Sequence, residues 1–257
     1  MQAPEKEEFY IGYQARAPRG LGAFLRVSVA VLLLLAAVVA VALVFGQGRF
    51  AESFFEYGIV REYQGVLRER PYPSLHVAAA DSQGSLPAGT PYALVAEGKH
   101  GADALVSGLD GKRVKLRGTL IHRGDLKMLE VVSGSIQPLS GESTGSEPEE
   151  ERLGFHTLAG EIVDSKCYLG VMNPGQAKPH RECAVRCISG GVPPLFVSSD
   201  KEGRVLHFWL VSETGGPVNQ EVLDLIAEPV EIGGEARRVN GRLYLRADPA
   251  RFRRLSR

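Results

Sequence analysis

A run of nineteen residues without a charged side chain, Val27 to Phe45, constrains the fold of this chain most. Ser28 is the only polar residue in the run. An α-helix of that length spans roughly 28 Å, close to the hydrocarbon thickness of a bilayer. A helix buried in a soluble core normally keeps a polar stripe, and this run has none. The sequence therefore predicts a transmembrane helix over residues 27–46, with the lipid bilayer as its partner.

The position of this run favours an uncleaved anchor over a cleaved signal peptide. Signal peptides have apolar regions of about 7–15 residues that end at small residues, whereas this run is longer and follows a 26-residue tail. Arg16, Arg19 and Arg26 precede it closely, while Arg49 and Arg61 follow it. This Lys/Arg bias places the N-terminus in the cytoplasm. We expect a single-pass protein of a bacterial cell membrane, with its C-terminal domains in an extracytoplasmic, periplasmic, oxidising compartment.

The chain after the apolar run divides at an acidic segment, residues 137–152. The Ser, Gly, Glu and Pro content of this segment leaves little apolar surface to bury, which is typical of a flexible linker. The regions on either side are each long enough for a small domain. The expected order is a cytoplasmic tail (1–26), the transmembrane helix (27–46), a first domain (50–136), the linker (137–152) and a second domain (153–257).

The two regions repeat one pattern of apolar residues and glycines. Both contain two stretches of alternating apolar and polar residues around a tight turn, which predicts a β-hairpin. The turns are Arg123-Gly124-Asp125 and Asn240-Gly241. A gapless alignment pairs Val114 with Val230, Leu116 with Ile232, Gly118 with Gly234, and Leu129 with Leu245.

Other shared features indicate a small barrel in each region. Each hairpin follows a short helical pattern, at residues 102–109 and 219–228, and Asn219 is a candidate N-cap of the second. Each region also begins with a strand through a glycine, Gly65 or Gly160, and glycines let strands bend enough to close a barrel. We predict a mainly β protein with two duplicated OB-like barrels, each with a short helix. A pair of generic β-sandwiches is the alternative.

The composition gives no support for nucleic-acid binding. The chain has 30 basic and 30 acidic side chains, whereas proteins that bind phosphate backbones usually have a basic excess. OB modules for single strands also need stacking aromatic residues beside a basic groove. Trp209 is the only tryptophan and lies in no basic run, and Phe208 points to the other face of the same strand. We expect no nucleic-acid partner.

The second region holds all three cysteines of the chain, together with one histidine between them. Cys167, His180, Cys183 and Cys187 follow the spacing Cys-x12-His-x2-Cys-x3-Cys. Residues 180–191 have the pattern of a short helix that ends at two glycines. Cys183 and Cys187 would then lie one turn apart on one face, with His180 at the helix start and Cys167 at a strand end. The four residues are the candidate ligands of one metal ion.

Three interpretations of this cluster remain open. Three thiolates and one imidazole are a known zinc donor set, and soft thiolates also suit Cu(I), so the cofactor would be zinc or copper. Alternatively, Cys167 forms a disulfide with Cys183 or Cys187, and the third thiol is reactive with His180 as a base. In the third interpretation the cysteines are small core residues without chemistry. Two flanking acids are candidates for hydrogen bonds to a ligand, or are solvated charges: Asp164 and Glu182.

The run GEIVDSKCYLGVMNPG, with the His, Cys, Cys, Gly-Gly and Pro that follow it, resembles segments of uncharacterised bacterial proteins that are membrane-anchored or secreted. In those proteins a similar V-D-x-x-C and H-x-x-C-x-x-x-C pair lies in a small OB-like β domain. The resemblance covers residues 160–197. It implies that the cysteines and the histidine act as one unit, and it implies no activity.

The sequence favours a non-enzymatic role. It has no Gly-rich phosphate loop, serine nucleophile elbow, His-Glu metalloprotease motif or Cys-x-x-Cys-His haem motif. We expect a metal-binding accessory of a membrane redox or metal-handling system, in contact with a membrane protein complex. The alternatives are a thiol-disulfide redox protein and a disulfide-stapled structural subunit of such a complex.

Overall fold

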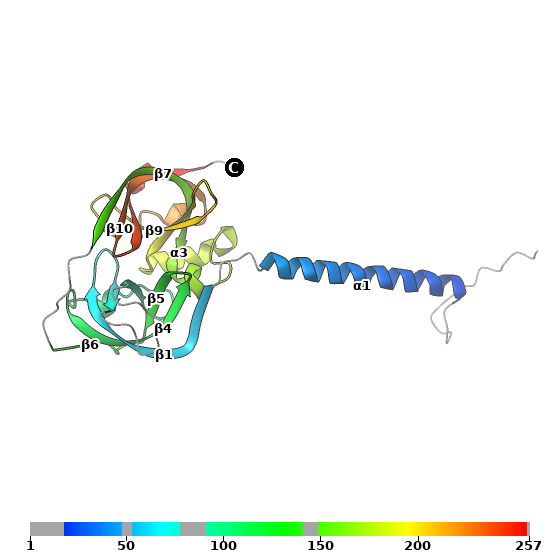
Figure 1. Ribbon diagram of the computed structural model, residues 1–257, viewed down its shortest axis with the longest axis horizontal. Coiled ribbons are helices and arrows are strands. Elements are labelled where there is room, and N and C mark those ends of the chain that lie inside the picture. The colour runs from blue at the N-terminus through cyan, green and yellow to red at the C-terminus, as the bar shows by residue number, and fades with distance from the viewer. Residues whose placement is uncertain (1–17, 48–52, 78–90, 141–148, 256–257) are drawn as a thin grey trace, which may run out of the picture. The chain divides into compact units, whose positions relative to one another are not determined.

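The computed structural model describes residues 18–47, 53–77, 91–140 and 149–255. The chain forms two compact units, Met1–Ala51 and Glu52–Arg257. The first unit contributes one long helix, and the second contains two β-barrels (Figure 1).

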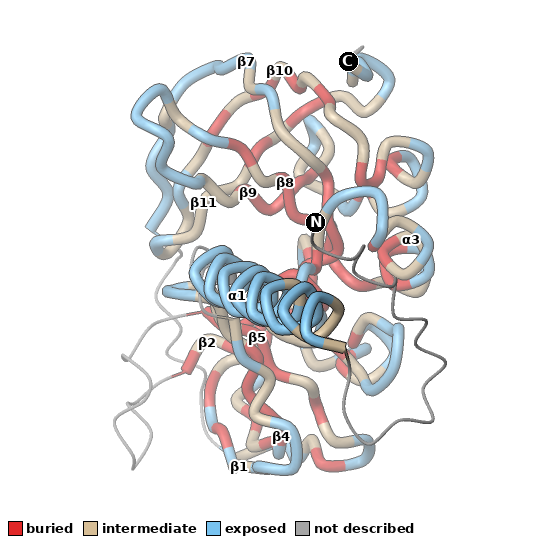
Figure 2. Tube along the Cα trace, turned by 90° about the vertical axis from the view of Figure 1, so that its right-hand side faces the viewer, coloured by how far each residue is buried: buried red, intermediate tan, exposed pale blue. Residues whose placement is uncertain are grey.

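The helix of the first unit, α1, extends over Arg19–Gln47. A stretch of 28 residues, Arg19–Gly46, is long enough to cross a membrane, and its most apolar part has a mean hydropathy of 3.1. No residue of that part is buried in the described structure, and the tube of α1 is coloured almost entirely as exposed (Figure 2). The helix begins before the apolar run, so that Arg19 and Arg26 belong to it, and Arg26 Nε donates to the Gly22 carbonyl oxygen. By length and composition α1 can span a bilayer, and a signal sequence near the N-terminus has the same properties. Arg16 and Arg49 lie outside the described residues.

The first barrel is a closed ring of five strands. Going round it, the order is β1-β2-β3-β5-β4 and back to β1, and every pair is antiparallel except β3 with β5. Helix α2 lies between β3 and β4 in the chain, and the short β6 pairs with Val114 and Lys115 near the start of β4. The bounds are β1 Ser53–Arg68, β2 Ser74–Val77, β3 Pro91–Val95, α2 Asp103–Val106, β4 Arg113–Arg123, β5 Leu126–Val131 and β6 Gln137–Pro138.

The second barrel repeats this topology. Its ring order is β7-β8-β9-β11-β10 and back to β7, and β9 with β11 is the parallel pair. Two five-stranded rings of this order, each with a helical turn before the fourth strand, confirm the prediction of two OB-like barrels. The bounds are β7 Glu150–Asp164, β8 Pro194–Ser199, β9 Val205–Val211, the 3₁₀ turn η3 Leu223–Leu225, β10 Pro229–Val239, β11 Arg242–Arg246, the 3₁₀ turn η4 Pro249–Arg251 and β12 Arg253–Arg254.

Strand register confirms the gapless alignment. Val114 lies opposite Gly65 in the first barrel, and its counterpart Val230 lies opposite Gly160 in the second. A Cβ atom on Gly65 or Gly160 would overlap a backbone carbonyl oxygen of the neighbouring strand. The close approach of two strands at the same place in each barrel therefore explains why a glycine occurs early in both regions.

Each barrel has its own core, and a third cluster of buried residues lies between the barrels (Figure 2). Phe208 belongs to the core of the second barrel, whereas Trp209 faces outward into the third cluster, as the alternation of side chains along a strand requires. Tyr72 of the first barrel also belongs to this cluster, and its hydroxyl donates to the Leu210 carbonyl oxygen at 2.6 Å. Contacts between the barrels are thus largely apolar and include buried hydrogen bonds.

Two sequence expectations differ in detail from the structure. The helix expected over residues 219–228 is only the 3₁₀ turn η3, and Asn219 is not an N-cap. Its side-chain amide instead donates to the carbonyl oxygens of Ile188 and Val192, at 2.9 Å each, so a tertiary contact takes the place of the local one. The two ends of the expected linker lie in β6 and β7, and residues 141–148 lie outside the described residues.

The second barrel differs from the first in the connection between its first two strands. In the first barrel, Leu67 pairs with Leu75, only eight positions later. The equivalent residues, Ile162 and Phe196, are 34 positions apart. The added segment contains every cysteine of the chain. Its elements are a π-helical turn η1 (Cys167–Val171), a 3₁₀ turn η2 (Lys178–His180) and helix α3 (Arg181–Ser189).

Candidate metal centre

The four predicted ligands come from three short elements of the added segment. Cys167 begins η1, His180 ends η2, and Cys183 and Cys187 lie one turn apart on α3. Ligand atoms of Cys167, His180 and Cys183 lie within 4.8 Å of one another. The ligand atoms of Asp164, Cys167 and Cys187 form a second group within 4.8 Å of one another. Cys167, His180 and Cys187 are buried and Cys183 is half-buried. The four predicted ligands therefore fall into two overlapping groups that share Cys167.

Helix α3 is fixed at its C-terminal end, which positions its two cysteines. The backbone N–H of Gly190 donates to the Arg186 carbonyl oxygen, so that the helix ends where the glycine pair predicts. The Ile188 carbonyl oxygen accepts the backbone N–H of Gly191 and also the side-chain amide of Asn219. A short helix held in this way presents Cys183 and Cys187 from a defined face.

Asp164 is fully buried and contacts both Cys167 and His180. One carboxylate oxygen accepts the backbone N–H of Cys167 at 2.7 Å, and the other lies 2.8 Å from Nε2 of His180. An ionised carboxylate only accepts hydrogen bonds, so the proton of the neutral imidazole is on Nε2. Nδ1 is left with a free lone pair, the state that a metal requires. Glu182, the other flanking acid, is exposed.

The three cysteines are free thiols that lie close together. The Sγ atoms of Cys167 and Cys183 are 3.9 Å apart. A hydrogen bond between Cys167 and Cys187 raises the pKa of the Cys167 thiol and lowers the pKa of Cys187. The negative charge is therefore favoured on Cys187, and Cys167 keeps its proton as the donor. Three sulfur atoms at this spacing, beside one imidazole nitrogen, are a set of soft ligands for one small ion.

Lys99 is a member of the cluster that the sequence pattern does not indicate. Its ammonium nitrogen donates to Sγ of Cys183 at 2.7 Å and lies 3.8 Å from Sγ of Cys187. The hydrogen bond to Cys183 is the main reason that the pKa of Lys99 is raised. Lys99 belongs to the connection between β3 and α2 of the first barrel, 84 positions before Cys183. No local pattern could have indicated it, because the contact depends on how the barrels pack.

Lys166, next to Cys167, makes the opposite contact, from the added segment into the first barrel. It is only 2% exposed, and its ammonium donates to the carbonyl oxygens of Ala96 at 2.8 Å and Gly98 at 2.6 Å. It also forms an ion pair with Glu130 of β5. Three acceptors match the three protons of an ammonium group, so this buried charge is fully compensated.

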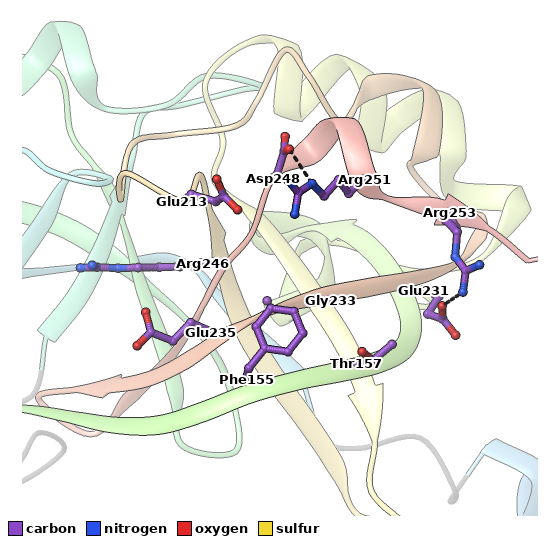
Figure 3. Close-up of a pocket in the computed structure, with 11 residues that line it drawn as sticks. Phe155, Thr157, Glu213, Glu231, Gly233, Glu235, Arg246, Asp248, Arg251 and Arg253 are labelled. Carbon is purple, nitrogen blue, oxygen red and sulfur yellow. Dashed lines mark hydrogen bonds and ion pairs between the residues drawn. The ribbon is translucent and has the colours of Figure 1, made fainter.

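A cavity of about 430 Å³ lies elsewhere, on the outer face of β7 and β10 (Figure 3). Phe155, which is 73% exposed, lies beside Gly233 in its floor. Charged residues of both signs also line it, and two ion pairs form among them, Asp248 with Arg251 and Glu231 with Arg253. None of the predicted ligands lines this cavity. The cavity is therefore separate from the cysteine cluster.

The fold and the cluster define a class of protein: two OB-like barrels, the second elaborated by a segment with a Cys3His group. Comparisons with models of protein families, with curated proteins and with solved structures find no match to this chain. The geometry of the chain's own residues is therefore the ground for any function assigned to it.

Proposed function

We propose that this protein is a membrane-anchored metal-binding protein whose second barrel holds one transition-metal ion outside the cytoplasm. The ligands would be Cys167, His180, Cys183 and Cys187, and the ion would be zinc or copper. The long apolar helix α1 supports the anchor. Two overlapping groups of close ligand atoms, which share Cys167 and together include all four residues, support the site.

The observation that carries this proposal is the buried contact between Asp164 and His180. Histidines that bind a metal usually donate their other ring N–H to a carboxylate or a carbonyl, which fixes the tautomer and the orientation of the ring. Burying both polar groups is costly unless they form a hydrogen bond with each other. The second oxygen of Asp164 holds the backbone of Cys167, a second proposed ligand. One buried side chain thus orders two ligands.

The role that fits this site best is that of a non-enzymatic accessory to a membrane redox or metal-handling system, in a membrane protein complex. A site with four protein ligands leaves no open position for a substrate or a water molecule, unlike catalytic zinc sites. Both barrels also have an apolar core that does not include the cysteines. The metal would therefore stabilise the added segment and its contacts rather than create the fold.

A combined measurement of metal and thiols tests the proposal. The full chain is purified in detergent without added metal, and bound metal and free thiols are measured on one sample. We expect one zinc or copper per chain, and three titratable thiols only after chelation. A sample with one free thiol and no metal, before and after incubation with zinc or Cu(I), would contradict the proposal.

A thiol-disulfide redox protein is the second candidate, and the 3.9 Å separation of the Sγ atoms of Cys167 and Cys183 favours it. A small movement of η1 would bring these atoms within bonding distance. Cys183 is the more accessible of the two thiols and has an ammonium group next to it, as reactive cysteines often do. Mass spectrometry of the alkylated protein distinguishes the candidates, because this one requires a disulfide between Cys167 and Cys183.

A further inference from the structure

The connection between β3 and α2 of the first barrel, residues 96–101, packs on the helix that carries two of the cysteines. The N–H of Gly101 donates to the carbonyl oxygen of Gly190 at 2.9 Å. A Cβ atom on Gly190 would overlap the carbonyl oxygen of Lys99, and one on Gly101 would overlap that of Gly191. The backbones of the two barrels therefore touch directly here, and the absence of side chains at the glycines permits it.

Two lysines cross this contact in opposite directions. Lys166 extends from the added segment to the carbonyl oxygens of residues 96 and 98. Lys99 extends from the connection back to the sulfur atoms of Cys183 and Cys187. The buried Lys166 thus binds the connection, and the connection contributes the exposed Lys99 to the cluster. Its position and that of the cysteines depend on each other.

The charge of a filled site gives Lys99 a specific role. Three thiolates and a neutral imidazole around a divalent zinc ion carry a net charge of minus one, and the same set around Cu(I) carries minus two. Hydrogen bonds to metal-bound sulfur and nearby cations stabilise such anionic centres. The ammonium of Lys99 is already within hydrogen-bond distance of Cys183.

We infer that Lys99 is a positioning residue of the metal site, supplied by the first barrel, and that the metal fastens residues 96–101 to α3. The inference rests on the proposed function. The coupling is reciprocal, because a contact that strengthens metal binding must itself be strengthened by the metal to the same extent. The affinity of the site for the metal then depends on the packing of the two barrels. A partner that displaced residues 96–101 from α3 would lower this affinity.

The affinity of the full chain for zinc, measured in detergent by competition with a chromophoric chelator, tests this inference. Loss of a residue that supports a metal ligand typically costs about 10–100-fold in affinity. We expect Lys99→Met to weaken zinc binding about tenfold, near the lower end because Lys99 is exposed, and Lys99→Arg to restore most of the loss. Lys112→Met, an exposed lysine of the same barrel, is the matched control and should bind zinc as the wild type does.

Two further readouts separate a direct role from a purely structural one. With Co(II) in place of zinc, the sulfur-to-metal charge-transfer band should shift in Lys99→Met and return in Lys99→Arg, because the band responds to hydrogen bonds on sulfur. Zinc should slow amide exchange in residues 96–101 of the wild type, and less so in Lys99→Met.

The outcomes also separate this inference from the proposed function. If the wild type binds one zinc ion and Lys99→Met binds it as tightly with an unchanged Co(II) spectrum, the role of Lys99 is wrong and the metal site stands. If the wild type binds neither zinc nor Cu(I), the proposed function fails and the role of Lys99 fails with it.

Discussion

Asp164 holds His180 in place before any metal arrives: a carboxylate oxygen of Asp164 lies 2.8 Å from Nε2 of His180, and both side chains are buried. The other oxygen accepts the N–H of Cys167. Preorganisation of this kind lowers the conformational cost of binding, because the ring cannot sample other orientations. It also leaves Nδ1 as the nitrogen available to a metal.

Replacing Asp164 with asparagine should weaken zinc binding about 10–100-fold, the usual cost of losing such a support. The amide oxygen can still accept the N–H of Cys167, but the amide NH₂ would then face the N–H of the imidazole and push the proton to the other nitrogen. Chelator competition measures the effect. The control is Asp125→Asn in the exposed turn between β4 and β5, which should leave the affinity unchanged. Equal zinc affinities of the two variants would show that Asp164 does not support a metal ligand.

Metal removal should leave both barrels folded. The cores of the two barrels contain none of the four ligands, whereas Cys167 and Cys187 belong to the cluster between the barrels. Chelation should therefore leave the β-sheet circular dichroism unchanged and speed amide exchange mainly in residues 96–101 and 165–191. Global unfolding on chelation is the contrary result, and would make the metal essential for the fold, as in small zinc domains.

The sequence alone was sufficient to predict the barrels, because their determinants are local and repeated. Val114 and Val230 lie at equivalent places in both rings, and the alternation around them marks which faces are buried. The helix expected at residues 219–228 failed because Asn219 binds the end of α3 instead of capping a helix. A partner far away in sequence overrode a local propensity there.

Only those members of the candidate site that lie close together in the sequence could be predicted. Cys167, His180, Cys183 and Cys187 lie in one segment, and helical periodicity was enough to place three of them together. Lys99 could not be found in this way. It reaches the cluster only because residues 96–101 pack on α3, and that packing depends on contacts spread over two barrels.

Alanine at Gly65 or Gly160 should destabilise the protein by about 1–3 kcal/mol, the usual cost of overpacking. At both positions a Cβ atom would overlap a carbonyl oxygen of the paired strand, of His76 or of Val197. Denaturant unfolding of each variant measures the cost. Gly216→Ala is the control, since a Cβ atom there meets only the Ser212 hydroxyl at an ordinary contact distance. If Gly65→Ala and Gly160→Ala are as stable as this control, the close strand approach does not require glycine.

Lys166→Met should cost about 3 kcal/mol of unfolding free energy, because it leaves the Glu130 carboxylate without its cation in a largely buried position. Two carbonyl oxygens of residues 96 and 98 also lose their donor. The double variant Glu130→Gln/Lys166→Met should recover part of this loss, because the uncompensated charge is then absent. Denaturant unfolding measures both variants. A double variant less stable than Lys166→Met would show that the charge of Glu130 is not the main cost.

Stability should fall as the pH is lowered from about 6.5 toward 4. Burial, together with the nearby guanidinium of Arg123, lowers the pKa of His207 to about 4. Burial and the charges of Arg242 and Arg68 likewise lower the pKa of His76 to about 4. An unfolded histidine titrates near 6.5, so between these values the unfolded chain binds more protons than the folded one, and acid favours unfolding.

Each of these histidines should contribute about 1–2 kcal/mol of unfolding free energy, after allowance for partial exposure to solvent. This contribution is fully present above pH 6.5 and is lost near pH 4. Unfolding free energies of metal-free wild type and of His207→Phe, measured at intervals from pH 7.5 to 4.5, test this. As the pH falls, the unfolding free energy of the wild type should decrease more than that of His207→Phe, because the variant lacks one histidine that binds a proton on unfolding. A difference that is constant across the range would show that His207 titrates alike in the folded and unfolded chains. In that case the contact between its Nε2 and the Tyr168 hydroxyl, 3.0 Å apart, would not depend on a neutral ring.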